Sequence, residues 1–140
     1  MAGIGKIGIL GGGSWATALA KIVLSTQKEI NWYMRRSEQV DEFKKIGHNP
    51  TYLPSAEFDT SCIHFYTDPE VNSFLRACDT VVLVTPSPYF KGVMKRVRKS
   101  SLRGKFIVNA IKGVVPDDHM LISEYMEKEF DVPKERVAII

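Results

Sequence analysis

A glycine-rich segment near the start of the chain carries its most specific chemical signal. An apolar run over residues 6–10 leads through Gly11 to Gly13 into residues 14–25, whose apolar side chains recur at helical spacing. The segment fits the pattern G-x-G-x-x-A, in which a strand turns tightly into a helix. The free N–H groups at a helix start carry partial positive charge and suit a pyrophosphate. We therefore predict the phosphate-binding turn of a dinucleotide domain; the alternative is a turn used only for chain reversal.

The pattern assigns a separate task to each position of the turn. Gly11 allows the tight turn out of the strand, and Gly13 lets the backbone approach the phosphates without a Cβ in the way. Ala16 keeps the helix close to the strand. Ser14 and Trp15 stand at the start of the helix, where their backbone N–H groups can donate to the ligand. The Trp15 ring can also form a wall of the cofactor site.

The end of the next predicted strand, over residues 30–34, indicates which dinucleotide is bound. About 20 residues after the glycines, a domain that binds NAD usually has an acidic residue for the ribose 2′-hydroxyl. This chain has Arg35, Arg36 and Ser37 there. Two guanidinium groups and a hydroxyl suit a 2′-phosphate, so we predict NADPH as the cofactor in preference to NADH. The alternative is that one arginine is only a solvated charge at the start of a helix.

Two further segments follow predicted strands and are expected at the same edge of the sheet. Residues 85–88, Thr-Pro-Ser-Pro, line the cofactor or serve only as a helix cap, and Pro86 is the candidate contact. Lys112, beside a glycine, can place an ammonium group on a substrate phosphate or carbonyl, although spacing alone favours a surface lysine. The basic run over residues 91–105 is expected to be a solvated face and not a nucleic-acid site, because no aromatic residues alternate with its charges.

Alternating apolar runs and helical patterns indicate the fold class. Strands are predicted at residues 6–10, 30–34, 63–66, 80–85, 106–110 and 137–140. Helices are predicted at residues 14–25, 37–45, 68–77, 87–99 and 117–130. The helix that ends at about residue 77 is expected to start with Asp68 as its N-cap and Pro69 as its first residue. The helix that ends at about residue 99 is expected to start in the same way with Ser87 and Pro88. The alternation predicts one α/β domain with a doubly wound parallel sheet of the Rossmann type, in three layers, α/β/α.

Composition and charge exclude several other classes of protein. The 140 residues are 44% hydrophobic and 25% charged, as in a globular domain, and the net charge of +3 is too small to indicate nucleic acid. Cys62 and Cys78 are predicted to be reduced, buried apolar residues, and the three histidines show no metal-ligand spacing. No signal peptide or membrane-spanning run is visible. These features favour a cytoplasmic protein that binds an anionic small ligand, with no metal and no membrane insertion.

Several motifs together resemble one family. Residues 11–20, Gly-Gly-Gly-Ser-Trp-Ala-Thr-Ala-Leu-Ala, resemble the G-x-G-S/N-W-G/A-T/S-A signature of glycerol-3-phosphate dehydrogenase, with Ala16 where many members have glycine. Further similarities lie at residues 32–35, at 49–54 (Asn-Pro-Thr-Tyr-Leu-Pro), at 85–87 and at 111–113. The tryptophan after G-x-G-S and the N-x-x-Y-L-P stretch are not generic to dinucleotide domains. The resemblance covers essentially the whole chain, and the bacterial NAD(P)-dependent branch fits best.

The resemblance implies reversible hydride transfer between NAD(P)H and dihydroxyacetone phosphate, which gives sn-glycerol 3-phosphate for phospholipid synthesis. It implies that Lys112 contacts the cofactor and also the substrate, in contrast to the interpretation from spacing. It also implies a homodimer for the intact enzyme. The residues expected to contact the cofactor are Gly11, Gly13, Ser14, Trp15, Arg35, Arg36, Tyr52, Pro86 and Lys112.

The family's second, helical domain has no counterpart in this sequence, and the chain ends on a predicted strand that has just begun, as expected of a fragment. That domain supplies the lysine expected in proton transfer and most of the substrate phosphate site. Residues 1–140 are therefore expected to form an NAD(P)-binding domain that binds nucleotide without turnover. Two alternatives stay open. One is another NADPH-dependent reductase, of the 2-dehydropantoate or 6-phosphogluconate type, against which Trp15 and residues 52–54 argue; the other is a non-catalytic module that senses nucleotides.

Overall fold

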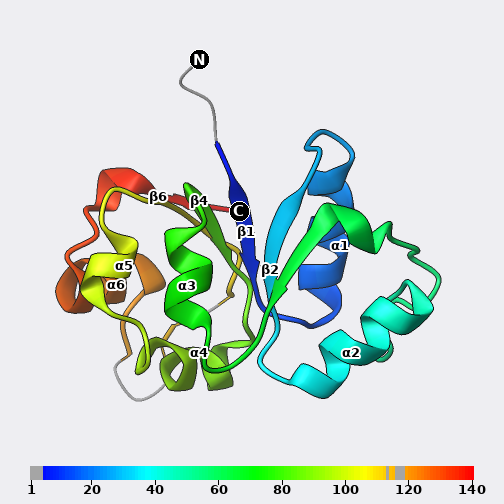
Figure 1. The fold of residues 1–140 in the computed structure, drawn as a ribbon. Coiled ribbons are helices and arrows are strands. Elements are labelled where there is room, and N and C mark those ends of the chain that lie inside the picture. Colours follow the sequence, from blue (N-terminus) through cyan, green and yellow to red (C-terminus); the bar gives the residue numbers. More distant parts are fainter. Residues whose placement is uncertain (1–4, 113, 116–118) are drawn as a thin grey trace.

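A six-stranded parallel sheet organises the chain (Figure 1). The computed structural model describes residues 5–112, 114–115 and 119–140. The strand order is β3-β2-β1-β4-β5-β6, in which the connections run in opposite directions from β1 and from β4. This is the doubly wound topology that the sequence predicts. The strands are β1 (Ile7–Leu10), β2 (Ile30–Tyr33), β3 (Ile63–Tyr66), β4 (Thr80–Leu83), β5 (Phe106–Asn109) and β6 (Val137–Ile139).

Helices cover both faces of the sheet, which confirms the predicted three-layer architecture. The first two helices pack on one face and the other four on the opposite face (Figure 1). Among the described residues, no helix combines the length and the apolar character that a membrane span requires. The helices are α1 (Ser14–Leu24), α2 (Ser37–Ile46), α3 (Val71–Arg76), α4 (Ser87–Met94), α5 (Lys99–Leu102) and α6 (Ile122–Phe130), with 3-10 turns at Thr60–Cys62 and Lys134–Arg136.

Two apolar cores, one on each face of the sheet, hold the layers together. Every residue of β1, β2 and β4 is buried, as expected of parallel strands covered on both faces. Because neighbouring side chains of a strand point to opposite faces, Ile9 packs toward α1 and α2, and Leu10 packs toward α3 and α4. Ala16 and Ala20 of α1 are fully buried. Their small side chains let α1 lie close to the strands, which holds the preceding glycine turn against the edge of the sheet.

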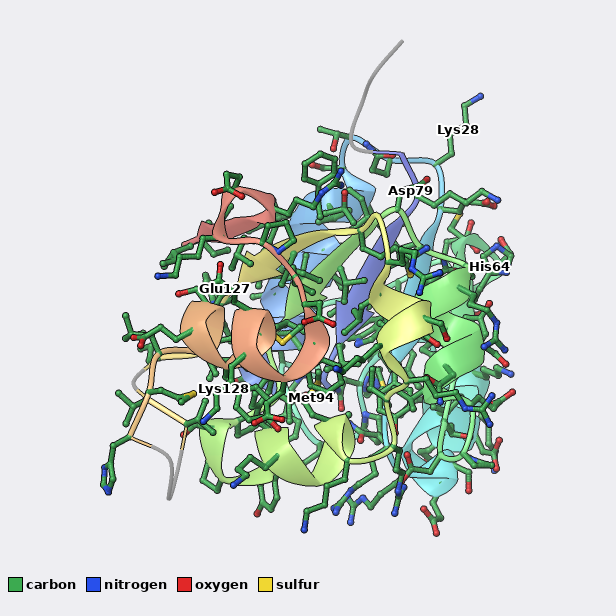
Figure 2. All side chains as sticks on the ribbon, turned by 90° about the vertical axis from the view of Figure 1, so that its left-hand side faces the viewer. Lys28, His64, Asp79, Met94, Glu127 and Lys128 are labelled. Atoms are coloured by element: carbon green, nitrogen blue, oxygen red, sulfur yellow. The ribbon has the colours of Figure 1, made fainter. Side chains whose placement is uncertain are left out.

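The amino ends of the strands lie opposite the glycine turn. Figure 2 shows Lys28, His64 and Asp79 together at this end of the molecule, away from α4. The Lys6 backbone N–H donates to Asp79 Oδ2 at 2.8 Å and so joins the chain before β1 to the chain before β4. Polar groups at this end of the sheet are therefore engaged by partners within the protein.

The start of α3 differs from the sequence prediction. The helix begins at Val71, so Asp68 is not its N-cap and Pro69 is not its first residue. The Asp68 carboxylate instead accepts a hydrogen bond from the Tyr33 hydroxyl and forms an ion pair with Arg96. Tyr33 and Arg96, which lie in other parts of the fold, therefore bind the Asp68 side chain that the local sequence pattern predicts as the N-cap of α3.

The helix predicted from Ser87 to about residue 99 is present but shorter: α4 ends at Met94, and a separate helix, α5, begins at Lys99. Ser87 is the first residue of α4, and Pro86 precedes it in the cap position. Between α4 and α5, Asn72 Nδ2 donates to Arg96 O at 2.8 Å, and Asn72 Oδ1 accepts from Arg98 N at 2.9 Å. Asn72 thus engages backbone groups that a continuous helix would use, and the basic run is divided over both helices and the loop.

Two further expectations need correction. The last helix begins at Ile122, not at residue 117, and Met120 forms an antiparallel bridge with Val115 before the helix starts. Residues 117 and 118 lie outside the described residues.

The two cysteines are both free thiols, but only Cys78 is buried. Cys62 is half-buried, because it ends an exposed 3-10 turn at the start of an edge strand.

Candidate functional site

The carboxyl ends of β1 and β4 border a cleft at the point where the strand order reverses. Ligands of open α/β sheets bind at this point. The cleft has a volume of about 270 Å³ and is formed by four segments: the glycine turn, the connection from β2 into α2, the loop before β3, and the connection from β4 into α4. Its lining residues are Gly11, Gly12, Gly13, Tyr33, Arg35, Arg36, Gln39, Tyr52, Thr85, Pro86, Tyr89 and Val93.

Gly11 and Gly13 meet different requirements within the turn. Gly11 has a φ of +141°, and a Cβ there would lie 2.9 Å from backbone atoms of Val84 and Thr85. The packing of the protein itself therefore requires glycine at this position. At Gly13 an added Cβ would meet no atom within 4 Å, and this residue lines the cleft. The space beside Gly13 is the close approach that a phosphate group needs.

The carbonyl groups of the turn are bound by donors inside the protein. The buried Trp32 donates from Nε1 to Gly11 O at 2.6 Å. The hydroxyl and the backbone N–H of Thr17 both donate to Gly13 O, at 2.7 and 3.0 Å. Within the described part of the chain, the backbone N–H groups of Gly12 and Gly13 have no protein acceptor. The groups of the turn that lack a partner are therefore donors, which suits an anion.

Two polar side chains that the sequence analysis did not assign to the site reach the same turn. Gln39 Nε2 and Asn49 Nδ2 donate to Gly12 O at 3.0 and 3.1 Å. Asn49 begins the Asn-Pro-Thr-Tyr-Leu-Pro stretch, and an asparagine that binds the backbone two residues on is a known turn signal, so its local role could have been foreseen. Gln39 lies on the polar face of α2, where the sequence contains no signal that separates it from its neighbours.

Two arginines give the cleft positive charge. Arg35 and Arg36 are both exposed, and the Arg35 guanidinium lies 5.7 Å from the centroid of the Tyr89 ring. This cation–π contact joins the end of β2 to α4 across the cleft wall. The Arg36 side chain has no hydrogen bond or ion pair with any described residue, and no described Asp or Glu lines the cleft. The charge of the site is therefore free to bind an anion.

The remaining predicted contact residues fall into two groups. Tyr52 and Pro86 line the cleft. The exposed side chains of Ser14 and Trp15, the first two residues of α1, do not line it. Lys112 is exposed beyond the end of β5, at the same edge of the sheet but outside the cleft lining. The ligand contacts of all these residues stay predictions.

Cysteine and histidine side chains lie outside the cleft lining. In the part of the chain that the structure describes, no three His, Cys, Asp or Glu residues form a group that could hold a metal ion. Burial raises the pKa of the Cys78 thiol to about 11, so this thiol is neutral in the folded protein. The chemistry of the cleft therefore rests on backbone donors, guanidinium groups and aromatic rings.

Known proteins share this sequence and this fold. Residues 6–140 match the family described as NAD-dependent glycerol-3-phosphate dehydrogenase N-terminus. The glycerol-3-phosphate dehydrogenase (NAD(P)+) of Shouchella clausii is 31% identical over 135 residues, which are 96% of this chain and 38% of that protein. The corresponding protein of Bacillus velezensis is 28% identical over 124 residues, 89% of this chain and 35% of that protein. The crystal structure of glycerol-3-phosphate dehydrogenase from Coxiella burnetii has a TM-score of 0.79 at 28% identity and covers 96% of this chain.

The similarity extends over nearly all of this chain but over a smaller part of its relatives. The chain spans 35% and 38% of the two bacterial sequences and 39% of the Coxiella burnetii chain. The residues matched by the family include the glycine turn, Arg35, Arg36 and every strand of the sheet. The chain therefore belongs to the family of NAD-dependent glycerol-3-phosphate dehydrogenase N-terminal domains.

Proposed function

We propose that this chain binds a nicotinamide dinucleotide in the cleft, as the N-terminal domain of a glycerol-3-phosphate dehydrogenase. One observation carries the proposal: among the described residues, the glycine turn at the switch point of the sheet has donors without protein acceptors, beside a cleft lined by two arginines and no carboxylate. The family match supports the same assignment. The nicotinamide ring supplies or accepts a hydride when it is bound.

The residues around the cleft divide the recognition of the dinucleotide between them. The backbone N–H groups of the glycine turn and of Ser14 and Trp15 hold the pyrophosphate at the start of α1, where the helix dipole favours negative charge. Tyr52 and Pro86 form walls of the cleft. Lys112 contacts the cofactor and the substrate from the loop that follows β5, a role supported by the resemblance to the family and by its place at the same edge of the sheet.

The proposal includes a preference for NADPH over NADH. Arg35 and Arg36 bind the 2′-phosphate, which NADH lacks. In the variant Arg36→Ala, the affinity for NADPH should fall about tenfold, whereas the affinity for NADH should change less than about twofold. Titration calorimetry of both ligands measures this. Arg103→Ala is the matched control, because Arg103 is also exposed but lies outside the cleft. Tighter binding of NADH than of NADPH by the unaltered chain would refute the cofactor assignment.

For a full-length enzyme of this family that contains the chain, we propose reversible reduction of dihydroxyacetone phosphate to sn-glycerol 3-phosphate, in the cytoplasm and as a homodimer. The names of the curated relatives support the reaction, and the resemblance to the family supports the cytoplasmic location and the homodimer. Because residues 1–140 span less than half of the length of these relatives, the chain by itself should bind NADPH without oxidising it. The absorbance of NADPH with dihydroxyacetone phosphate present tests this, and any protein-dependent oxidation contradicts it. NADPH should also bind more weakly than it binds to a full-length enzyme of the family.

A further inference from the structure

A buried asparagine ties the loop before β3 to the glycine turn. Asn49 is 0% exposed. Its Nδ2 donates to Gly12 O at 3.1 Å and to Thr17 Oγ1 at 2.9 Å. The Thr17 hydroxyl in turn donates to Gly13 O at 2.7 Å. One side chain therefore fixes two successive carbonyl groups of the turn, one directly and one through Thr17.

The oxygen of the same amide holds the loop. Asn49 Oδ1 accepts from the backbone N–H groups of Thr51, at 3.0 Å, and of Tyr52, at 3.2 Å, and from Gln39 Nε2 at 3.2 Å. Because backbone N–H groups only donate, they determine which end of the amide is the oxygen, and they leave Nδ2 for the turn. Tyr52 lines the cleft, so its backbone is joined to the glycine turn through Asn49.

The geometry of the peptide bond converts these contacts into a direction for the donors of the turn. In a planar trans peptide, the C=O of one residue and the N–H of the next point in opposite directions. Asn49 binds Gly12 O from inside the protein, so the Gly13 N–H is directed away from Asn49. Thr17 has the same effect on Gly13 O and the Ser14 N–H. A rotated Gly12 carbonyl would replace a donor by an acceptor, which repels a phosphate.

We propose that Asn49 is a positioning residue for nucleotide binding. It holds the peptide between Gly12 and Gly13 with the N–H group available to the pyrophosphate, and it keeps Tyr52 beside the turn. Asn49 is buried behind the turn and acts through these neighbours. The inference rests on the proposed function, because it requires a ligand with a pyrophosphate in the cleft.

The test compares two ligands, so that positioning of the pyrophosphate site can be separated from general stability. NADPH contains a pyrophosphate, whereas adenosine 2′-monophosphate shares the 2′-phosphate but lacks the pyrophosphate. In Asn49→Ala, the affinity of the 140-residue chain for NADPH should fall about tenfold. The affinity for adenosine 2′-monophosphate should change less than about twofold, because its phosphate depends on the arginines. Titrations followed by nuclear magnetic resonance yield both values.

Asn31 provides a matched control. It is also a buried asparagine, but its Nδ2 donates to Ala77 O at 3.2 Å, at the amino end of the sheet and away from the cleft. Asn31→Ala should lower the midpoint of thermal unfolding without a selective loss of NADPH binding. Should Asn49→Ala fail to fold, Thr17→Val tests the same connection, because it removes the hydroxyl between Asn49 and Gly13 O with little change in shape. It should reproduce the selective loss in part, because Asn49 still binds Gly12 O and the Thr17 backbone N–H still binds Gly13 O.

Each outcome decides the inference. A selective loss of NADPH binding supports it. Equal losses for both ligands, or unchanged NADPH binding, overturn the positioning role of Asn49 while the proposed function stands. If the unaltered chain binds neither ligand, the proposed function fails first, and the inference fails with it.

Discussion

The two ends of the sheet use their polar groups differently. At the amino end, the Lys6 N–H donates to Asp79, Lys105 Nζ donates to Cys78 O, and His64 Nε2 lies 3.2 Å from Glu29 Oε2. At the carboxyl end, the glycine turn has N–H groups for which the described residues provide no acceptor, beside two exposed arginines. The hollow at the amino end is the larger, about 560 Å³ against about 270 Å³. Unused hydrogen-bonding and charge capacity, and not volume, therefore distinguishes the proposed ligand site.

The same difference recurs within the glycine turn. Gly11 is required by contacts inside the protein, whereas Gly13 borders the open cleft. Substitutions that damage folding and substitutions that damage binding should therefore separate along one short segment.

The largest expected effect is the loss of stability in Gly11→Ala. An alanine at a φ of +141°, with its Cβ 2.9 Å from the backbone of Val84 and Thr85, should cost about 3 kcal/mol of unfolding free energy. Gly13→Ala is the matched variant. It should lose no more than about 1 kcal/mol, because the added Cβ meets nothing, yet it should lose most of its affinity for NADPH. Urea unfolding and NADPH titration measure both properties. Equal destabilisation by the two variants would remove the distinction.

The second effect concerns the amino end and depends on pH. Burial raises the pKa of Cys78 from its ordinary value of 9.0 to about 11. The neutral thiol is thus favoured in the folded state. Its contribution to stability is fully present below about pH 9 and is lost as pH rises toward about 11. Between about pH 8 and about pH 10.5, the expected loss is about 2 kcal/mol of unfolding free energy. Unfolding midpoints at about pH 8 and about pH 10.5 measure the decline.

Cys78→Ala serves as the control for this titration. The variant starts from a lower stability at neutral pH, because it loses a buried sulfur, but its stability should decline less between the two pH values. NADPH affinity at neutral pH should be the same in both proteins, because the thiol lies at the end of the sheet opposite the cleft. A decline of equal size in the two proteins would show that other groups cause it.

The sequence predicts those features whose signals are local, and fails where distant residues decide. The glycine turn, α1 and the six strands lie within two residues of their predicted positions. The cap of α3 was misplaced because Asp68 binds Tyr33, 35 positions away, and the break after α4 depends on Asn72, which binds Arg96 across 24 positions. The contact from Asn49 to Gly12 spans 37 positions. No local pattern reports such contacts, so the support behind the turn became visible only in the structure.

A smaller effect tests whether a polar side chain in the cleft serves the ligand or the protein. Thr85 lines the cleft, but its hydroxyl donates to Leu10 O at 3.1 Å, and this hydrogen bond joins the ends of β4 and β1. Thr85→Val keeps the shape and removes the donor, and it should cost about 1 kcal/mol of unfolding free energy. NADPH affinity should change less than about twofold, because the hydroxyl is already engaged. A tenfold loss of affinity without loss of stability would assign Thr85 to the ligand instead.

The smallest effect is expected at the amino end, from the contact between the His64 ring and the Glu29 carboxylate. The two side chains are 53% and 60% exposed, and the closest nitrogen and oxygen atoms are 3.2 Å apart. Exposed pairs of this kind are screened by water and lose side-chain entropy when they form, so Glu29→Gln should change the unfolding free energy by less than about 0.5 kcal/mol. It should leave NADPH affinity unchanged, although Glu29 and His64 line the larger hollow. A clear loss of NADPH affinity would show that the amino-end hollow takes part in binding. It would contradict the assignment of the ligand to the carboxyl end of the sheet alone.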